Sequence, residues 1–382
     1  MPNRNTLRGP RGTARGLRWA ALLCAAVALA ACERQATTTA AGTWRLQEIK
    51  TLVGPGPGQA FFGVRGVAIR PDGRLAVVEE DAKRVSVFEP NGAFVAVVGR
   101  IGKGVGEYTL PYSAAWLGDS LGVYDAGTGR VVTYTGTTAP AGERPTFSIT
   151  GDAIVRWYPV SPAKAYLRTV RGSGTTFSPA LIGYDSRGPG DTVALPPPPK
   201  TPMGTTCHMG AGSEYMQWPE QPLQMVLPVR SDGALAIAYA DDYRINVVGP
   251  RGDTLTRITR DIPRAPMRLA QWDSALDRFH TLVQRYGPTV CDAPPGPPSY
   301  FAPLRAMTLS ADGNLWVTVL TKNGITFDVY GLDGTFKASI PAPSHVMSVP
   351  VAASADHLVL VTDVKAGAVP RRQVVHVYSI TR

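Results

Sequence analysis

The chain has 382 residues, of which 40 are glycine and 34 are proline, so nearly a fifth of it consists of turn-forming residues. This composition favours many short strands over long helices. The formal net charge of +10 would suggest nucleic-acid binding if it were spread through the chain, but five arginines precede Ala31, where no acidic residue occurs. The rest of the chain contains 34 basic and 29 acidic residues, which is an ordinary charge balance for a protein surface. Since no nucleic-acid-binding motif is present, we expect no nucleic-acid partner.

The first 31 residues have the layout of an export signal. A basic segment is followed by thirteen apolar residues, Trp19 to Ala31, which are too few for a helix of about 20 residues that crosses a bilayer. The stretch Leu29-Ala30-Ala31-Cys32 resembles the lipobox of bacterial lipoproteins. That resemblance implies that Cys32 is the lipid anchor and the mature N-terminus. An ordinary secretory signal beside an incidental cysteine is the alternative.

Residues 32–43 follow as a polar tether of small residues without periodicity. We therefore expect residues 1–31 to be a lipoprotein signal peptide, 32–43 a flexible tether and 44–382 the folded domain. The expected location is the bacterial cell envelope, either facing the periplasm or at the cell surface. The membrane contact is then made through the lipid.

The segment from Val64 to Gly99 reads as four short strands joined by three turns. Its first hairpin motif recurs along the chain, with an Asp-Gly pair before an apolar run. A second turn follows each copy 19 to 21 residues later. The three motifs are PDGRLAVV at 71–78, SDGALAIA at 231–238 and ADGNLWVT at 311–318. Repeats of this length, each a small sheet that cannot bury both faces alone, are typical of a β-propeller.

Weaker copies fill the gaps at 113–134, 153–196 and 349–380, which brings the number of blades to six. The copy at 153–196 is the poorest match, so five or seven blades stay open at this stage. The last copy holds only three strands, whereas residues 44–53 form a lone strand before the first full blade. We expect this N-terminal strand to join the last blade and to close the ring, because closure removes exposed sheet edges.

The stretch from Phe62 to Pro111 resembles the NHL-repeat propellers and the wider TolB-like group of six-bladed propellers. In those repeats the second strand ends in an acid and the third begins with arginine, as at Glu79 with Arg84 and Asp125 with Arg130. Tyr239 replaces the acid before Arg244 and departs from the pattern. The resemblance implies an all-β, six-bladed β-propeller. We interpret each acid–arginine pair as an ion pair that fixes a loop, rather than as a ligand group.

The face of the ring opposite the short turns carries every long connection. Two insertions between blades, 197–221 and 261–299, lie on it, and loops of that length usually bind, cover or stabilise something. The loops between second and third strands share this face and supply the candidate ligand residues. These are Glu79, Glu80, Asp81, Asp125, Asp241 and Asp242.

The second insertion contains an amphipathic helical pattern. Apolar residues recur at spacings of three and four and stop at Gly287-Pro288; they are Leu269, Trp272, Leu276, Phe279, Val283 and Tyr286. We expect this stripe to pack as a cap on the propeller. A mobile lid is the alternative, and the mixed charge of the polar face disfavours a membrane-surface role.

Two cysteines remain outside the signal, Cys207 and Cys291, with one in each insertion. In an exported domain an even pair favours a disulfide. Zinc ligation together with His208 and His280 is the alternative, although the spacing fits no standard zinc motif.

Catalytic signals are few, since the chain contains no HExxH motif. Our first hypothesis is a binding or scaffold protein that uses the insertion face, with an unknown protein, peptide or glycan as partner, acting as a monomer without a cofactor. The alternative is a metal-dependent hydrolase or lyase, resembling the lactonases of this broad group, with calcium or zinc at the channel mouth. His345 is then a candidate that faces the channel. Converging carboxylate, Asn or His side chains at the mouth would favour the enzyme, and an apolar lining would favour binding.

Overall fold

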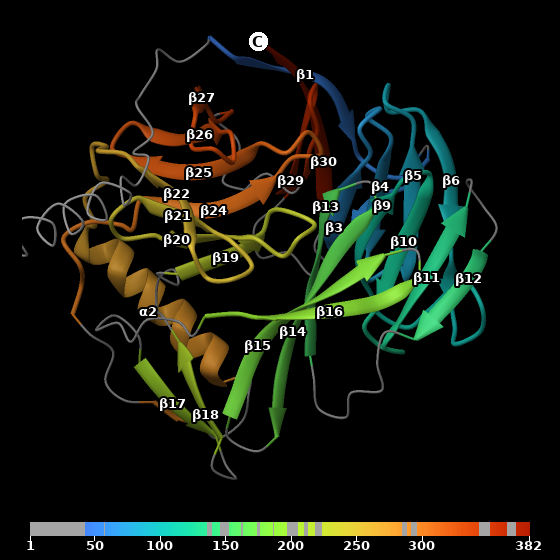
Figure 1. Ribbon diagram of the computed structural model, residues 1–382, viewed down its shortest axis with the longest axis horizontal. Coiled ribbons are helices and arrows are strands. Elements are labelled where there is room, and N and C mark those ends of the chain that lie inside the picture. The colour runs from blue at the N-terminus through green and yellow to red at the C-terminus, as the bar shows by residue number, and fades with distance from the viewer. Residues whose placement is uncertain are drawn as a thin grey trace, which may run out of the picture. The chain divides into compact units, whose positions relative to one another are not determined.

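The chain forms a ring of six antiparallel sheets, which are the blades of a six-bladed β-propeller (Figure 1). This confirms the fold class expected from the repeats. The computed structural model describes residues 43–56, 58–135, 140–145, 153–161, 163–173, 176–185, 187–196, 205–209, 213–217, 224–284, 289–291, 296–343, 352–364 and 372–382. Among these residues no helix is both long and apolar enough to cross a membrane.

Blades 1 and 2 each consist of four consecutive strands, which we call a to d from the centre of the ring outward. Blade 1 contains β3 (Val64–Ile69), β4 (Leu75–Glu79), β5 (Arg84–Phe88) and β6 (Phe94–Val98). Blade 2 contains β9 (Pro111–Leu117), β10 (Ser120–Asp125), β11 (Arg130–Thr135) and β12 (Pro140–Pro145). Between them lie β7 (Arg100–Ile101) and β8 (Glu107–Tyr108), a short parallel pair.

Blades 3 to 5 repeat the same order. Blade 3 contains β13 (Ala153–Ser161), β14 (Lys164–Ser173), β15 (Thr176–Asp185) and β16 (Gly188–Ala194). Blade 4 contains β19 (Gln224–Pro228), β20 (Leu235–Tyr239), β21 (Arg244–Val248) and β22 (Thr254–Thr259). Blade 5 contains β24 (Leu304–Leu309), β25 (Leu315–Thr321), β26 (Gly324–Tyr330) and β27 (Phe336–Pro341).

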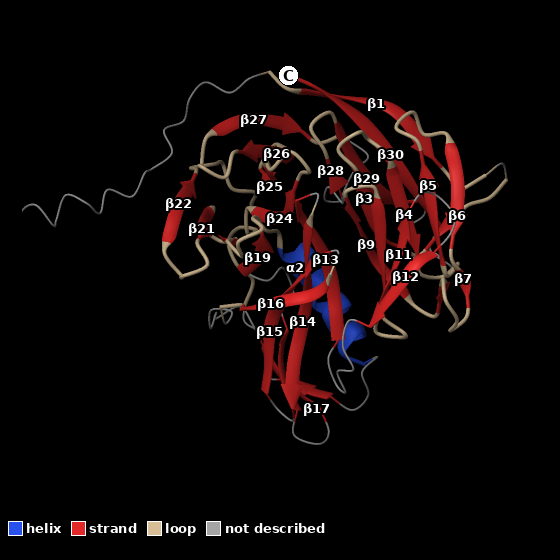
Figure 2. Cartoon of the chain, turned by 45° about the vertical axis from the view of Figure 1, so that its right-hand side comes forward, coloured by secondary structure: helices blue, strands red, loops and turns tan. Residues whose placement is uncertain are grey.

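Blade 6 joins the two ends of the described chain. Its inner strands come from the C-terminal part of the chain, and its outer strand is N-terminal, as the sequence predicts (Figure 2). The strands are β28 (Ala352–Ala353), β29 (His357–Asp363), β30 (Arg372–Thr381) and β1 (Arg45–Leu52), with β2 (Phe61–Phe62) also paired to β30. Arg45 lies opposite Thr381 and Leu52 lies opposite Val375.

The a–b and c–d turns of blades 1, 4 and 5 are built alike, because glycine supplies a left-handed backbone at the same point of each. In the a–b turns Gly73 and Gly233 have φ values of 92° and 95°, and in the c–d turns Gly92 and Gly252 have 79° and 87°. The residue before the first arginine of strand c is also left-handed, even where it is not glycine, as at Tyr243 with φ 45°. The Asp-Gly equivalence inferred from the sequence therefore reflects a repeated backbone conformation.

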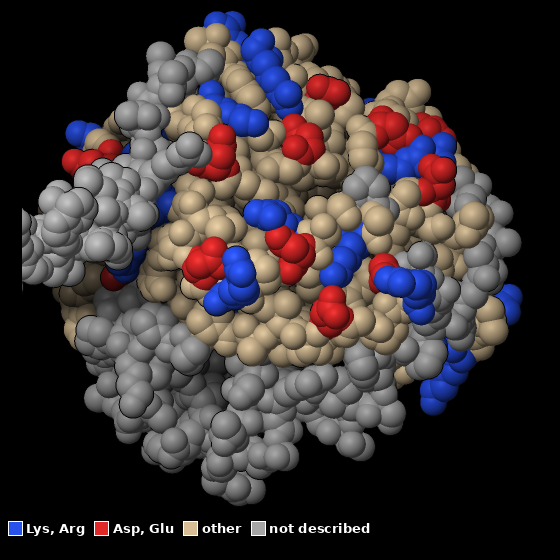
Figure 3. All heavy atoms as spheres, in the orientation of Figure 1, with Lys and Arg blue, Asp and Glu red and all other residues tan. Residues whose placement is uncertain are grey.

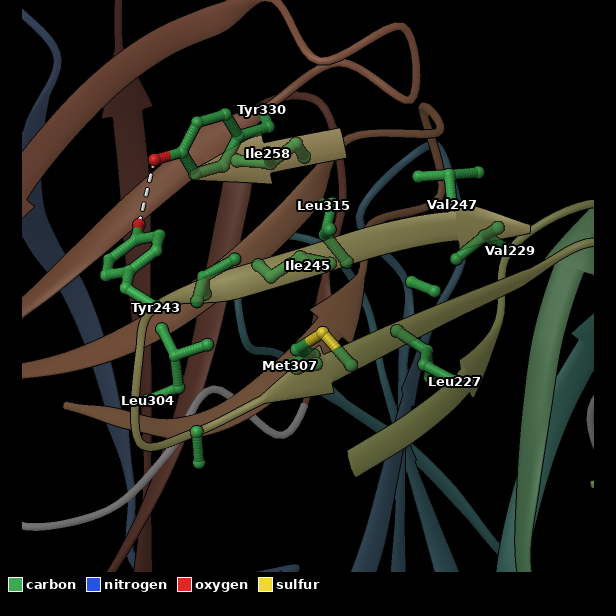
Figure 4. Close-up of a cluster of buried hydrophobic side chains, with 14 of the residues drawn as sticks. Leu227, Val229, Tyr243, Ile245, Val247, Ile258, Leu304, Met307, Leu315 and Tyr330 are labelled. Atoms are coloured by element: carbon green, nitrogen blue, oxygen red, sulfur yellow. Dashed lines mark hydrogen bonds between the residues drawn. The ribbon is translucent and has the colours of Figure 1, made fainter. Parts of the chain in front are cut away.

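The hydrophobic core consists of clusters that lie between neighbouring blades, and each pair of adjacent blades shares one. Figure 4 shows the cluster between blades 4 and 5, where Ile245 and Leu304 are fully buried. There the Tyr243 and Tyr330 hydroxyl groups are 2.8 Å apart. Asp328, also fully buried, accepts hydrogen bonds from Tyr243 and from Arg260 Nη1 at 2.6 Å. Burial raises the pKa of the Tyr330 hydroxyl to about 12, so it stays protonated at neutral pH.

The two insertions form structure of their own between blades. Strands β17 (Thr205–Met209) and β18 (Ser213–Gln217) come from the first insertion, and β23 (Thr289–Cys291) comes from the second. They pair in the order β18-β17-β23. This sheet was not predicted from the sequence.

Helix α2 (Leu269–Gln284) lies in the second insertion and agrees with the predicted amphipathic pattern. Figures 1 and 2 both show it at the same end of the molecule as β17. The side chains of Trp272, Ala275 and Phe279 are buried at the expected spacing, whereas Leu269, at the first helical residue, is 66% exposed. The buried stripe fits a helix packed on the protein.

The acid–arginine pair of blade 1 is a buried structural tie. Glu79 is fully buried and accepts hydrogen bonds from Arg84 at 2.8 and 3.1 Å. It also accepts one from Ser86 Oγ at 3.1 Å and one from the Phe62 backbone N–H at 3.3 Å. Four donors on one carboxylate offset its removal from water. The pair therefore joins strands b and c to the segment that precedes blade 1.

Replacing Arg84 by Met should lower the free energy of unfolding by about 3 kcal/mol, because it leaves the Glu79 carboxylate buried without its charged partner. The matched control is Arg100→Met. It removes an arginine bond to Glu107 of 2.9 Å, but Arg100 is 80% exposed, and an exposed pair contributes under about 1 kcal/mol. Urea unfolding of both variants measures the difference, and equal small losses would contradict a structural role for the Glu79–Arg84 pair.

Candidate functional site

The a strands of the blades surround a central cavity of about 750 Å³. The cavity runs along β3 from Val64 to Asp72 in the a–b turn that follows. We call the end at Val64, on the face opposite the a–b turns, the inner end. One end of the cavity lies at the a–b turn face of the ring, and we call this end the mouth. Residues of five blades in or next to these turns line it, namely Pro71 and Asp72, Gly118 and Asp119, Ser161, Ser310 and Ala311, and Ala353.

Between its ends the cavity is lined by aliphatic and aromatic side chains. The a strands supply them because those strands carry small or apolar residues that leave room at the centre of the ring. The main contributors are Val67, Ile69, Tyr112, Trp116, Leu227, Met307 and Leu309. Ser113 also lines this part and is 5% exposed, and its hydroxyl has no hydrogen-bond partner. The cavity is thus mainly apolar between its ends.

Charged residues among the described lining stand only at the two ends. At the inner end Arg65 pairs with Glu80 and lies over the Tyr112 ring, 5.7 Å from its centroid. At the mouth Arg70 Nε donates to Asp72 at 2.8 Å, and Arg70 Nη1 donates to Asp119 at 2.8 Å. The second of these bonds links the turns of blades 1 and 2.

The ion pair at the mouth shifts both partners toward their charged forms. The hydrogen bond from Arg70, with help from the Arg74 backbone N–H, lowers the pKa of Asp72 to about 2. The same bond raises the pKa of Arg70 above its ordinary value. The Arg70 guanidinium also lies 5.7 Å from the centroid of the Trp116 ring. Asp72 and Arg70 are therefore both charged at neutral pH.

The acidic residues singled out from the sequence divide into two kinds. Glu79 and Asp125 are fully buried, and their carboxylates accept hydrogen bonds from backbone N–H groups. Asp125 accepts from the Leu110 backbone N–H at 2.5 Å and from Thr128 Oγ1 at 2.6 Å. The others lie at or near the surface, where Glu80 pairs with Arg65, Asp242 lies 3.3 Å from Arg244, and Asp81 and Asp241 are exposed.

In blade 4, Tyr239 stands where the acid ends strand b in blades 1 and 2, and the arginine makes a different contact. The Arg244 guanidinium lies over the Tyr239 ring, 4.4 Å from its centroid. A cation–π contact therefore occupies the place of the acid–arginine pair.

Within the described residues no group of three or more His, Cys, Asp or Glu side chains could hold a metal ion. The mouth contributes two carboxylates, and Arg70 lies between them. His280 is exposed on α2, and His345 lies outside the described part of the chain. The convergence of ligand groups that would favour a metal-dependent enzyme is thus not found among the residues described.

The two cysteines of the insertions meet in the added sheet. Strand β17 pairs antiparallel with β23, and Cys207 stands directly opposite Cys291 in the register. Residues opposite each other in an antiparallel pair have Cα atoms about 4.5 to 5.5 Å apart. This spacing lies within the range that a disulfide requires.

The surface charge is mixed. On the face shown in Figure 3, acidic and basic side chains lie next to each other, and neither sign forms a continuous area. This agrees with the near balance of charge after the N-terminal arginines. No described feature indicates a polyanionic partner.

Comparisons with known proteins support the fold. No model of a known protein family matches the chain, and no curated protein sequence matches it. A solved structure from Bacteroides fragilis, of a protein thought to be exported, superposes with a TM-score of 0.51 at 13% identity and covers 91% of this chain and 98% of its own. Virginiamycin B lyase from Staphylococcus aureus gives 0.45 at 11% identity, with 89% and 99% covered. Regucalcin, a calcium-binding protein from Agrobacterium tumefaciens, gives 0.40 at 11% identity, with 88% and 96% covered.

At these identities the similarity concerns the fold alone. The fold and the cavity together define the class of protein as a six-bladed β-propeller with an apolar cavity at its centre. Its members include proteins of unrelated activity, so function has to be argued from the cavity itself.

Proposed function

We propose that the chain is an exported, lipid-anchored propeller that binds a small apolar or amphipathic molecule in its central cavity. The observation that carries this proposal is the cavity of about 750 Å³, lined between its ends by aliphatic and aromatic side chains. Sites for small molecules usually measure about 300 to 1,000 Å³ and are mostly apolar, with a few polar groups that fix orientation. The pair of Arg70 with Asp72 and Asp119 at the mouth supplies such polar groups.

Two observations favour binding over metal-dependent catalysis. The lining is apolar, which is the outcome that the binding hypothesis predicts. The described residues also lack the three-ligand cluster that a lactonase-like site uses. A protein, peptide or glycan partner at the insertion face stays a prediction from the sequence.

The substitution Ala311→Trp tests the cavity. Ala311 is exposed and lines the mouth, so a tryptophan there narrows the entrance without filling the core. We expect the wild-type chain to bind the uncharged dye N-phenyl-1-naphthylamine with a saturable rise in fluorescence, and the variant to bind it at least about tenfold more weakly. Ala163→Trp, which changes an exposed a–b turn residue of blade 3 outside the lining, is the matched control. Equal binding by all three proteins would refute the cavity as the site.

The lipid anchor is the second part of the proposal. A lipobox-like stretch ends at Cys32, and a 12-residue tether, 32–43, separates it from the folded domain. We propose residues 1–31 as the signal peptide and the bacterial cell envelope as the location. Export also agrees with the way the Bacteroides fragilis protein is described.

Cys32→Ser should release the protein from the membrane fraction, because the acyl chains that hold it are attached to the cysteine sulfur and to the new N-terminus. Cell fractionation and the intact mass of the mature chain measure this. Protein that stays membrane-bound with an unchanged mass would rule out Cys32 as the anchor.

We also propose that Cys207 and Cys291 form a disulfide that ties the two insertions together. Their direct opposition in the β17–β23 register supports the bond. The bridge closes a loop of about 84 residues, for which chain entropy gives a stabilisation of about 4 kcal/mol. A zinc site at this pair would need further ligands within reach.

Peptide mapping without reduction should recover the peptides of Cys207 and Cys291 joined, in protein exported to an oxidising compartment. Cys207→Ser should abolish the joined peptide and lower the free energy of unfolding by about 2 to 4 kcal/mol. Two thiols that both react with a labelling reagent before reduction would show that the bridge does not exist.

A further inference from the structure

The mouth of the cavity carries one negative charge in excess. Elsewhere on the a–b turn face some carboxylates have an arginine of their own, as in Arg74 with Glu89 at 2.7 Å and Arg382 with Asp312 at 2.9 Å. At the mouth, in contrast, the single arginine Arg70 donates hydrogen bonds to two carboxylates, those of Asp72 and Asp119. The second carboxylate, on Asp119, is 91% exposed, so most of its accepting capacity faces solvent.

Below this charged entrance the cavity changes to an apolar lining. Ile69 and Leu309 lie next to the turns, and Val67 and Met307 follow deeper in. Deeper still lies Ser113, a small residue that is 5% exposed. Burying an uncompensated charge in such a lining is costly, whereas an apolar chain gains by leaving water. The arrangement therefore selects a molecule with a charged head at the mouth and an apolar body inside.

The mouth also lies on the face from which the chain enters the propeller. Arg45, at the start of β1, is opposite Thr381. The neighbouring Arg382 donates to Ala355 O at 2.7 Å and to Asp312, which belong to the a–b turns of blades 6 and 5. A 12-residue tether reaches at most about 40 Å, so an anchor at Cys32 keeps this face within that distance of the lipid surface.

We infer that the cavity holds the apolar chain of an amphiphile whose head carries a positively charged ammonium group, bound at the mouth beside Asp119. The head replaces the missing second cation of the Arg70, Asp72 and Asp119 group. The inference rests on the proposed function, since it assigns the ligand class of the same cavity. Because the mouth face is the tethered face, we take the ammonium amphiphile to come from the membrane.

Titration calorimetry of the full chain carrying Cys32→Ser tests the head group. The probes are decyltrimethylammonium, decyl maltoside and decyl sulfate, each below its micelle concentration. They share one alkyl chain and carry a cationic, an uncharged and an anionic head group, respectively. We expect the ammonium probe to bind about three- to fivefold more tightly than the maltoside, the range of one exposed ion pair, and the sulfate to bind least tightly. Asp119→Asn should bring the ammonium and maltoside affinities within about twofold of each other.

Asp273→Asn is the matched control, because it removes the same charge from an exposed residue of helix α2, in the insertion on the opposite face. It should leave the preference for ammonium unchanged. Equal affinity for all three probes in the wild-type sequence would overturn the head-group inference while leaving binding in the cavity intact. Failure of all three probes, together with failure of the uncharged dye, would overturn the proposed function as well.

A second arm distinguishes the source of the ligand. Donor vesicles of phosphatidylcholine, with a pyrene-labelled acyl chain on a fraction of the lipid, are mixed with unlabelled acceptor vesicles and the same protein. Transfer of the label that depends on the protein, and that Ala311→Trp suppresses, supports a lipid taken from the bilayer. Preferential binding of decyltrimethylammonium without transfer supports the same chemistry in a dissolved amphiphile and overturns the membrane source.

Discussion

The pairing of the first described strand with the last one holds the ring together. Blade 6 has an inner strand of two residues, Ala352–Ala353, and its outer strand is supplied by β1 from the other end of the chain. The same pairing buries Leu52 against blade 1 and brings Trp44 to Trp316 of blade 5, with ring centroids 6.2 Å apart. Three blades thus depend on β1. Without this closure the a strands would not enclose a cavity.

Much of the fold could be predicted from the sequence, because the features that define it are local. An Asp-Gly pair at a turn leads to a left-handed glycine, as at Gly73 and Gly233, and this fixes where each hairpin reverses. The spacing of these turns then sets the length of a blade. The closure of the ring could be predicted by counting strands, because the three strands of the last copy and the single strand before the first copy make one complete four-stranded blade. The helix was predictable for the same reason, because Trp272, Ala275 and Phe279 share a face through local spacing.

The rest depends on contacts that no local pattern reveals. The strands β17 and β23 are separated by blade 4, so their pairing depends on how the ring brings the insertions together. The residues that line the central channel could not be predicted, because a strand of alternating side chains does not show its distance from the axis of the ring. The available signal was the run of small or apolar residues in the first strand of each copy, such as Gly66 to Ile69. The length of the two insertions instead favoured the opposite face of the ring as the functional one.

The different roles of the acidic residues could not be predicted either, because they too depend on contacts that are distant in the sequence. Glu79 and Asp125 were singled out together with surface residues because sequence shows a carboxylate but not its donors. Their donors include backbone N–H groups of Phe62 and Leu110, which lie well before them in the chain. A carboxylate with such partners organises loops, and those loops in turn fix the ends of the a strands that line the cavity.

The closing strand also sets the order in which the protein can mature. The hydrogen bond from Ser379 to Gln47 joins residues that are 332 positions apart, so β1 has no partner until nearly the whole chain has been made. Contacts of such long range are slow to form, because the entropy of closing the loop is lost before the contact stabilises anything. Under the export that we propose, the first strand to cross the membrane has to wait for the last one. The ring then closes only after the whole chain has been translocated.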